Sequence, residues 1–143
     1  MDMQAADATG NGKMYVEFPI RVKTYDTDYM GIVNNTVYVK WIDDLRTALF
    51  DKYLPIEARM KERNSPIIAE TTVRYKKPLT MLSKPVGAAW MEEIQKSRWV
   101  MRCVIRVGEA VHCEGRQEGY YFNTERMKPV RFPEEFLKLH GVL

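Results

Sequence analysis

Two carboxylates and a glycine lie within one short segment, residues 25–35, which reads Tyr-Asp-Thr-Asp-Tyr-Met-Gly-Ile-Val-Asn-Asn. The second carboxylate, Asp28, stands just before a stretch whose apolar spacing predicts a helix. The first backbone N–H groups of a helix lack partners within it, so they can polarise a carbonyl oxygen. The segment therefore predicts a site in which Asp28 attacks a carbonyl carbon or activates water beside an oxyanion-binding helix start.

Four further residues of the segment could shape this site. Gly31 can adopt backbone angles that a Cβ opposes, which lets a carbonyl group approach the amides at the helix start. Asn34 or Asn35 is the natural N-cap, because asparagine side chains accept hydrogen bonds from the first free N–H groups of a helix. Asp26 is the weaker catalytic candidate, and either aspartate could simply satisfy the amides of a turn.

The serines, histidines and cysteines of this chain do not have the spacing of other kinds of catalytic centre. No serine lies in a Gly-x-Ser-x-Gly elbow, which argues against a serine hydrolase triad. His112 and His140 lie far from Asp28 in the sequence. Neither histidine has the spacing of a metal ligand relative to the two cysteines, Cys103 and Cys113. We therefore expect both histidines to be structural or surface residues, and we predict no metal site.

The periodicity of apolar residues indicates which elements would position the site. Alternation over residues 14–22 predicts a half-buried strand, and residues 35–54 carry an apolar stripe with helical spacing that ends before a proline. Four further strands are predicted by alternation, at residues 67–76, 86–94, 99–107 and 111–123. The last three form an antiparallel meander, because only short turns join them. A short helix is expected at residues 133–140, whereas residues 56–65 form a charged connection of no predicted type.

This order of elements predicts an α+β domain in which an antiparallel sheet curls around the long helix. With 143 residues we expect one domain, spanning residues 14–143, after a flexible segment at residues 1–13. The net charge is +3, from 22 basic and 19 acidic residues. That charge is too dispersed for a dedicated nucleic-acid binder and suits a small anionic ligand better.

Two properties of the chain indicate its compartment. No stretch approaches the roughly 18 apolar residues that span a bilayer, and residues 1–13 lack the apolar core of a signal peptide. We therefore expect a cytoplasmic protein without a membrane span. In that compartment Cys103 and Cys113 are expected to be reduced, buried thiols.

The segment 28–33, Asp-Tyr-Met-Gly-Ile-Val, followed by Tyr38 in the helix, resembles the loop of hotdog-fold thioesterases of the 4-hydroxybenzoyl-CoA thioesterase type. The likeness extends in element order and length over residues 14–139. It implies the hotdog fold and an acyl-CoA thioesterase activity that uses no metal or redox cofactor. It also implies that Asp28 is the catalytic carboxylate and that backbone amides near Asn35 polarise the thioester carbonyl.

The resemblance further assigns residues that contact the substrate. In the family a basic turn contacts the nucleotide phosphates of CoA, and here that turn holds Lys96, Ser97 and Arg98. Asn34 and Tyr38 would lie along the acyl group, although large aromatic residues such as Tyr38 more often belong to the core. Two other basic segments are alternatives for the phosphates, at residues 76–77 and 126–128.

The resemblance also predicts an assembly. Domains of the family pair their sheets edge to edge, which places Glu70 and Thr72 of one chain near Asp28 of its neighbour. A sheet with an unpaired edge tends to find a partner on physical grounds as well, so we expect a homodimer or homotetramer. The family often carries an aromatic residue or histidine where Asn34 and Asn35 stand. This departure leaves the identity of the acyl group open. The hotdog-fold dehydratases need a histidine near the helix start, so its absence from these positions counts against dehydration.

Two rival functions remain open. A hotdog domain could bind acyl-CoA or an aromatic ligand without turnover, and hydrolysis assays would separate such a module from an enzyme. Alternatively, acyl carrier protein could be the true thioester donor. Its protein-borne pantetheine lacks the adenine nucleotide, so substitution of Lys96 and Arg98 would then have no effect.

Overall fold

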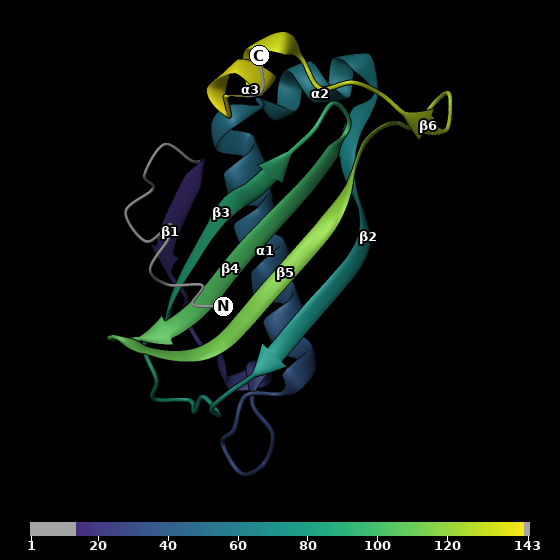
Figure 1. Cartoon of the computed structure of the whole chain (residues 1–143). Coiled ribbons are helices and arrows are strands. Elements are labelled where there is room, and N and C mark those ends of the chain that lie inside the picture. The colour runs from purple at the N-terminus through teal and green to yellow at the C-terminus, as the bar shows by residue number, and fades with distance from the viewer. Residues whose placement is uncertain (1–13, 142–143) are drawn as a thin grey trace.

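The computed structural model describes residues 14–141, and the segment at residues 1–13, which we expect to be flexible, lies outside the described residues. Figure 1 shows one antiparallel sheet wrapped around one side of a long helix, α1, as the sequence predicts. In chain order the elements are β1 (Tyr15–Pro19), the 3₁₀ turn η1 (Thr24–Asp26), α1 (Asn35–Tyr53), α2 (Ile56–Glu62), β2 (Asn64–Tyr75), β3 (Val86–Ile94), β4 (Arg98–Val107), β5 (Ala110–Asn123), β6 (Lys128–Pro129) and α3 (Glu134–Leu139).

The strands are arranged in the order β1-β3-β4-β5-β2, with β6 paired to the end of β5. β3, β4 and β5 form the predicted antiparallel meander at the centre. β1 pairs with β3 and β2 pairs with β5, so β1 and β2 are the two edges of the sheet. β2 is 12 residues long, and its outer backbone edge has no partner strand within residues 14–141.

The apolar stripe of α1 packs against the concave face of the sheet. Ile42, Leu45 and Leu49 of α1 are fully buried, and they share one cluster with Met91 of β3 and Met101 of β4. Burial of each such side chain stabilises the fold by about 1.5–3 kcal/mol relative to exposure. This packing holds α1 at one position on the sheet and thereby determines where its N-terminus lies.

Two glycines of β5 permit close approach of neighbouring elements. A Cβ at Gly115 would lie 2.9 Å from Cδ1 of Ile42, so the glycine allows α1 to pack directly on the strand. A Cβ at Gly119 would lie 1.7 Å from the backbone oxygen of Ile67, beside the irregularity in the register of β2. The glycine at residue 119 therefore lets the edge strand β2 approach β5 closely enough to follow the curl of the sheet.

The segment of no predicted type, residues 56–65, begins with the helix α2, which ends at Arg63 in the left-handed region with φ 61°. Few of its residues are apolar, so periodicity could not reveal it. Its buried side chain is Arg59, whose Nε donates to the backbone oxygen of Leu54 at 3.0 Å and whose guanidinium pairs with Asp51. Pairing with α1 in three dimensions, and not an apolar stripe, stabilises this helix.

The first strand is shorter than the predicted residues 14–22. It ends at Pro19 because the chain then leaves the sheet to reach the start of α1. Ile20 still donates to the backbone oxygen of Pro85 at 2.8 Å, but the next residues turn into η1. At the other edge, β2 begins at Asn64, three residues before the predicted start, since it pairs with β5 as far as Asn123.

The two cysteines, Cys103 and Cys113, are free and buried, as predicted. Burial raises the pKa of the Cys113 thiol to about 12 and raises that of Cys103 as well. Both groups are therefore protonated at neutral pH, and thiolate chemistry is excluded for them.

Substitution of Gly119 by alanine tests the close approach of β5 and β2. We expect Gly119→Ala to lower the free energy of unfolding by at least about 2 kcal/mol, because the added Cβ meets backbone and not a movable side chain. Chemical denaturation measures the loss. Gly108→Ala is the control, since its Cβ would meet nothing within 4 Å and costs only the positive φ of 59°. A loss at residue 119 no larger than at residue 108 would contradict the packing argument.

Candidate functional site

The predicted active-site segment forms a tight loop immediately before α1. The backbone N–H of Asp28 donates to the oxygen of Ile32 at 2.9 Å, and that of Gly31 donates to the oxygen of Asp28 at 3.0 Å. A bridge between Thr27 and Val33 closes the base of the loop. Gly31 has a φ of 76°, so the turn requires the backbone freedom predicted for this glycine.

The carboxylate of Asp28 is exposed and oriented by its own loop. Its Oδ1 accepts hydrogen bonds from the backbone N–H of Met30 at 2.9 Å and of Ile32 at 3.1 Å. Its Oδ2 has no hydrogen-bond partner among residues 14–141. The side chain therefore satisfies turn amides, the ordinary role considered for it, and still presents one oxygen for chemistry.

The other aspartate of the segment, Asp26, is a structural residue. Only 7% of its surface is exposed, and its Oδ2 accepts from the backbone N–H of Lys23 at 2.8 Å. Its backbone oxygen accepts from the N–H of Asn34 at 3.0 Å. Asp26 thus ties η1 to the start of α1, and it is not the group that faces solvent.

The start of α1 offers unpaired amides, although not in the predicted manner. Asn34 occupies the N-cap position, but neither its side chain nor that of Asn35 caps the helix, which corrects the predicted side-chain cap. Within residues 14–141 no group accepts from the backbone N–H of Asn35 or Thr36. These donors remain available to a carbonyl oxygen because both asparagine side chains lie exposed at the helix start.

Tyr38, predicted to line the acyl group, lies in the core of the single chain. It is 2% exposed, and its ring packs edge-on against Trp41 at 5.4 Å and Tyr75 at 5.2 Å between centroids. Tyr75 in turn donates from its hydroxyl to the backbone oxygen of Asn35 at 3.0 Å. The aromatic pair therefore anchors the start of α1 to β2.

Sequence reasoning missed a polar cluster between α1 and the β2 side of the sheet. Gln117 is fully buried, and its Nε2 donates to Asp43 at 3.1 Å and to Thr71 at 3.2 Å. Its Oε1 accepts from Arg46 at 3.1 Å. The available signal was a glutamine at a helix-facing position of the strand, between Gly115 and Gly119 on the same face.

This cluster also shows which face of β2 each residue occupies. Thr71 faces α1, so its neighbours Glu70 and Thr72 point to the opposite face of the sheet. All three residues are exposed on the edge strand. The predicted contact of Glu70 and Thr72 with a neighbouring Asp28 stays a prediction, and Thr71 is the residue of this segment on the helix side.

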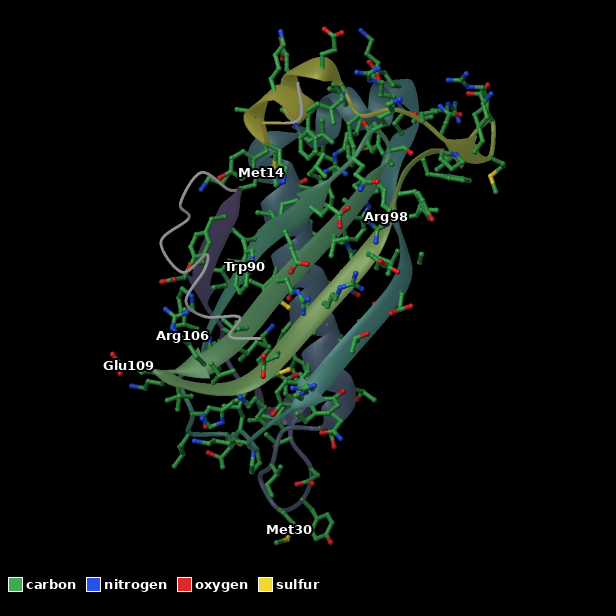
Figure 2. All side chains as sticks on the ribbon, in the orientation of Figure 1. Met14, Met30, Trp90, Arg98, Arg106 and Glu109 are labelled. Atoms are coloured by element: carbon green, nitrogen blue, oxygen red, sulfur yellow. The ribbon has the colours of Figure 1, made fainter. Side chains whose placement is uncertain are left out.

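The predicted phosphate-binding turn, residues 96–98, lies at the end of the molecule opposite the Asp28 loop. Figure 2 shows Arg98 and Met30, the latter at the tip of the Asp28 loop, at opposite ends of the sheet. Arg98 also pairs with Glu93 at 3.2 Å and with Glu118 at 2.7 Å, and the hydrogen bond that it donates to Glu118 raises the pKa of Arg98. One chain therefore does not bring this turn, Ser97 included, to Asp28.

His112 contacts the backbone of the connection that follows β2. Nδ1 of His112 lies 3.1 Å from the backbone oxygen of Pro78, between the strands and their connection. Among residues 14–141 no three His, Cys, Asp or Glu side chains are grouped as metal ligands would be. Of the helices in the same span, none combines the length and hydropathy that a membrane crossing requires.

The chain is similar to proteins of one family. Residues 22–139 match the family model of the thioesterase-like superfamily. The Bacillus subtilis (strain 168) protein named "Putative acyl-CoA thioesterase YneP" is 28% identical over 125 residues, which cover 85% of this chain and 89% of that protein.

Solved structures share the fold. DHNA-CoA thioesterase from Staphylococcus aureus has a TM-score of 0.77 at 22% identity and covers 90% of this chain and 87% of its own. A hypothetical protein from the same organism, in complex with CoA, has a TM-score of 0.83 at 12% identity over 89% of this chain and 82% of its own. These likenesses confirm the hotdog fold predicted from the sequence.

The different roles of the two aspartates can be separated by stability measurements. We expect Asp26→Ala to lower the free energy of unfolding by about 1–3 kcal/mol, because the backbone N–H of Lys23 loses its charged acceptor in a part-buried hydrogen bond. Asp28→Asn should change it by less than about 0.5 kcal/mol, since the amide oxygen still accepts from the loop. Thermal or denaturant unfolding gives both values. Similar losses for the two variants would show that Asp26 has no special structural role.

Proposed function

The chain belongs to the thioesterase-like superfamily and is a thioester hydrolase, and we propose that it hydrolyses an acyl-CoA to the free acid and CoA. The observation that carries this proposal is the oriented Asp28 carboxylate, whose Oδ2 has no partner among residues 14–141 and whose loop leads directly into the free amides of the α1 start. Support for the substrate class comes from the relative named as an acyl-CoA thioesterase and from the similar structure in complex with CoA.

The proposed mechanism uses both parts of the site. The thioester carbonyl faces the backbone N–H groups of Asn35 and Thr36, which stabilise negative charge on its oxygen. Asp28 then either attacks the acyl carbon, forming an anhydride that water opens, or removes a proton from an attacking water. In both courses the C–S bond breaks, one water is consumed to give the free acid, and the sulfur leaves as the CoA thiol after taking a proton. In the anhydride course the acyl carbon first bonds an oxygen of Asp28, and water then opens the anhydride and restores the carboxylate. No metal or redox cofactor is needed for either course.

The proposed active unit is a dimer formed through β2. Its 12 residues end the sheet with an unpaired backbone edge, which a second β2 can complete. Two such strands related by a two-fold axis run antiparallel, so the end of one chain that holds Lys96 lies at the end of the other that holds Asp28. The shared site predicted from the sequence therefore requires two chains.

A second candidate donor is acyl carrier protein, and one observation favours it. Arg98, half of the predicted phosphate-binding pair, is already neutralised by two carboxylates. A substrate without the nucleotide would not need this turn. Equal kcat/KM values for acyl-CoA and for the acyl group on carrier protein would support this alternative.

Substitution of Asp28 tests the mechanism directly. We expect Asp28→Asn to lower kcat by about a hundredfold or more, because an amide neither attacks nor accepts a proton effectively. The loop geometry should persist, since the asparagine oxygen can replace Oδ1 toward Met30 and Ile32. A panel of short, long and aromatic acyl-CoAs with detection of the free thiol measures the effect. Full activity in this variant would reject Asp28 as the catalytic group.

Mixing of two inactive chains tests the shared site. One chain carries Asp28→Asn, and the other carries alanines at residues 70–72 of β2. Co-folding should recover about a quarter of the wild-type activity, because half of the dimers are mixed and one of their two sites is then intact. Sedimentation of the wild type checks the assembly. An active monomer at assay concentration would reject the dimer, and a dimer without recovery would reject the composite site.

A further inference from the structure

A groove runs between the end of β1 and the N-terminal half of α1, on the side of the helix away from the β2 edge. Its volume is about 570 Å³. A smaller hollow of about 450 Å³ adjoins it and shares Arg21, Lys23 and Tyr25 with it. We call both hollows together the β1–α1 groove. The residues that line its larger part are Phe18, Pro19, Ile20, Arg21, Lys23, Tyr25, Asp26, Val37, Lys40, Trp41, Asp43 and Asp44.

The cations of this groove have no ion-pair partner among residues 14–141. Arg21, Lys23 and Lys40 are exposed, and none forms an ion pair with any residue in the described span 14–141. Arg21 and Lys23 come from the segment after β1, whereas Lys40 comes from α1 across the groove. Because two elements contribute the charges, they converge on one volume and do not form a simple solvated face.

The acidic residues of the groove cancel these charges only in part. Asp26 is buried and bound to the backbone N–H of Lys23. Asp43 pairs with Arg46 at 2.5 Å and accepts from Gln117 at 3.1 Å. Asp44 is the remaining acid. Three cations without an ion-pair partner among residues 14–141 stand against two carboxylates without one, Asp26 and Asp44. The net charge of the groove is therefore positive, which favours an anionic ligand.

An aromatic surface accompanies these charges. Tyr25 is 75% exposed, and the Lys23 ammonium lies 5.7 Å from the centroid of its ring. An exposed aromatic ring beside cations can bind a nucleotide. The base stacks on the ring, and the cations bind the negatively charged phosphates. Tyr25 differs in this respect from an aromatic residue of the core such as Tyr38, which is buried.

We infer that the β1–α1 groove binds a nucleoside phosphate, with the base against Tyr25 and the phosphates between Arg21, Lys23 and Lys40. This inference rests on the proposed function in one respect: the ligand is then the nucleotide end of the CoA substrate. The groove suits that role because its wall, residues 25–26, leads directly into the loop of Asp28. A single chain would thus hold both ends of the substrate, whereas the Lys96 turn requires a second chain.

Direct binding of nucleotides to a charge-removal variant tests the groove. ADP and free CoA are titrated calorimetrically into wild type and into the triple variant Arg21→Ala, Lys23→Ala, Lys40→Ala. We expect Kd for both ligands to rise at least about tenfold in the variant, because each lost cation removes a charge-assisted contact with phosphate. The wild-type Kd should also rise with salt. Asp44→Asn should bind more tightly than wild type, since it removes the opposing charge.

Matched controls separate this site from general effects. The triple variant Lys61→Ala, Arg131→Ala, Lys138→Ala has the same change in net charge on the far end of the molecule, and its Kd should stay within about twofold of wild type. If the triple variant folds poorly, the single variant Lys40→Ala, on the exposed side of α1, takes its place. It should lose part of the affinity for ADP and CoA. Nucleotide affinity retained in the groove variants, or lost only in Lys96→Ala with Arg98→Ala, would overturn the inference.

Kinetics distinguish failure of the groove from failure of the proposed function. The preference in kcat/KM for acyl-CoA over the matching acyl-pantetheine should fall about tenfold in the groove variant. An unchanged preference would reject the groove as the CoA subsite. If wild type hydrolyses no thioester of the panel while ADP binding still depends on the three cations, the proposed function is rejected and the nucleotide site is retained.

Discussion

The packing of α1 into the curl of the sheet is the interaction on which the rest of this protein depends. Ile42, Leu45 and Leu49 are fully buried against β3 and β4, and Gly115 lets the helix lie directly on β5. With the helix held along its whole length, its N-terminus can emerge at one place only. The loop of Asp28 and the unpaired amides of the first helical turn lie next to each other for this reason.

The start of α1 is secured from several directions although no side chain caps it. Asp26 accepts from Asn34 behind the helix, and Tyr75 of β2 donates to Asn35 from the sheet. These contacts leave the first amides free, as an oxyanion site requires, and still prevent the turn from fraying. A conventional side-chain cap would occupy the same donors, so its absence is consistent with a helix start reserved for a ligand.

The charges of the chain divide into those used by the fold and those left for ligands. Arg98 and Arg116 share Glu118, and Arg106 pairs with Glu17 on the outer face of the sheet, where Figure 2 shows its side chain beside β4. The first pair joins the neighbouring strands β4 and β5, the second lies within β5, and the third reaches from β4 across β3 to β1. Cations engaged in such pairs contribute little free binding capacity. Arg21, Lys23 and Lys40 have no such partners among the described residues, and they surround a groove close to the Asp28 loop. The chemistry and the free positive charge therefore lie at one end of α1.

The sequence by itself determined the order and type of the main elements, because alternation and helical spacing are local properties of the chain. It also identified the Asp28 loop, since the left-handed conformation of Gly31 and the following helix are encoded within a few residues. It could not find α2, which is stabilised by the pairing of Arg59 with Asp51 and not by an apolar stripe.

Only the tertiary structure decided which residues share a site. Asp26 and Asp28 are the same type two positions apart, yet one is buried by the entry into α1 and the other faces solvent. Arg98 reads as a free cation in the sequence, but strand pairing places Glu118 against it, and it lies at the wrong end of α1 to reach Asp28 within one chain. Contacts between residues distant in sequence depend on how the helix and strands pack, and that packing is a property of the whole core.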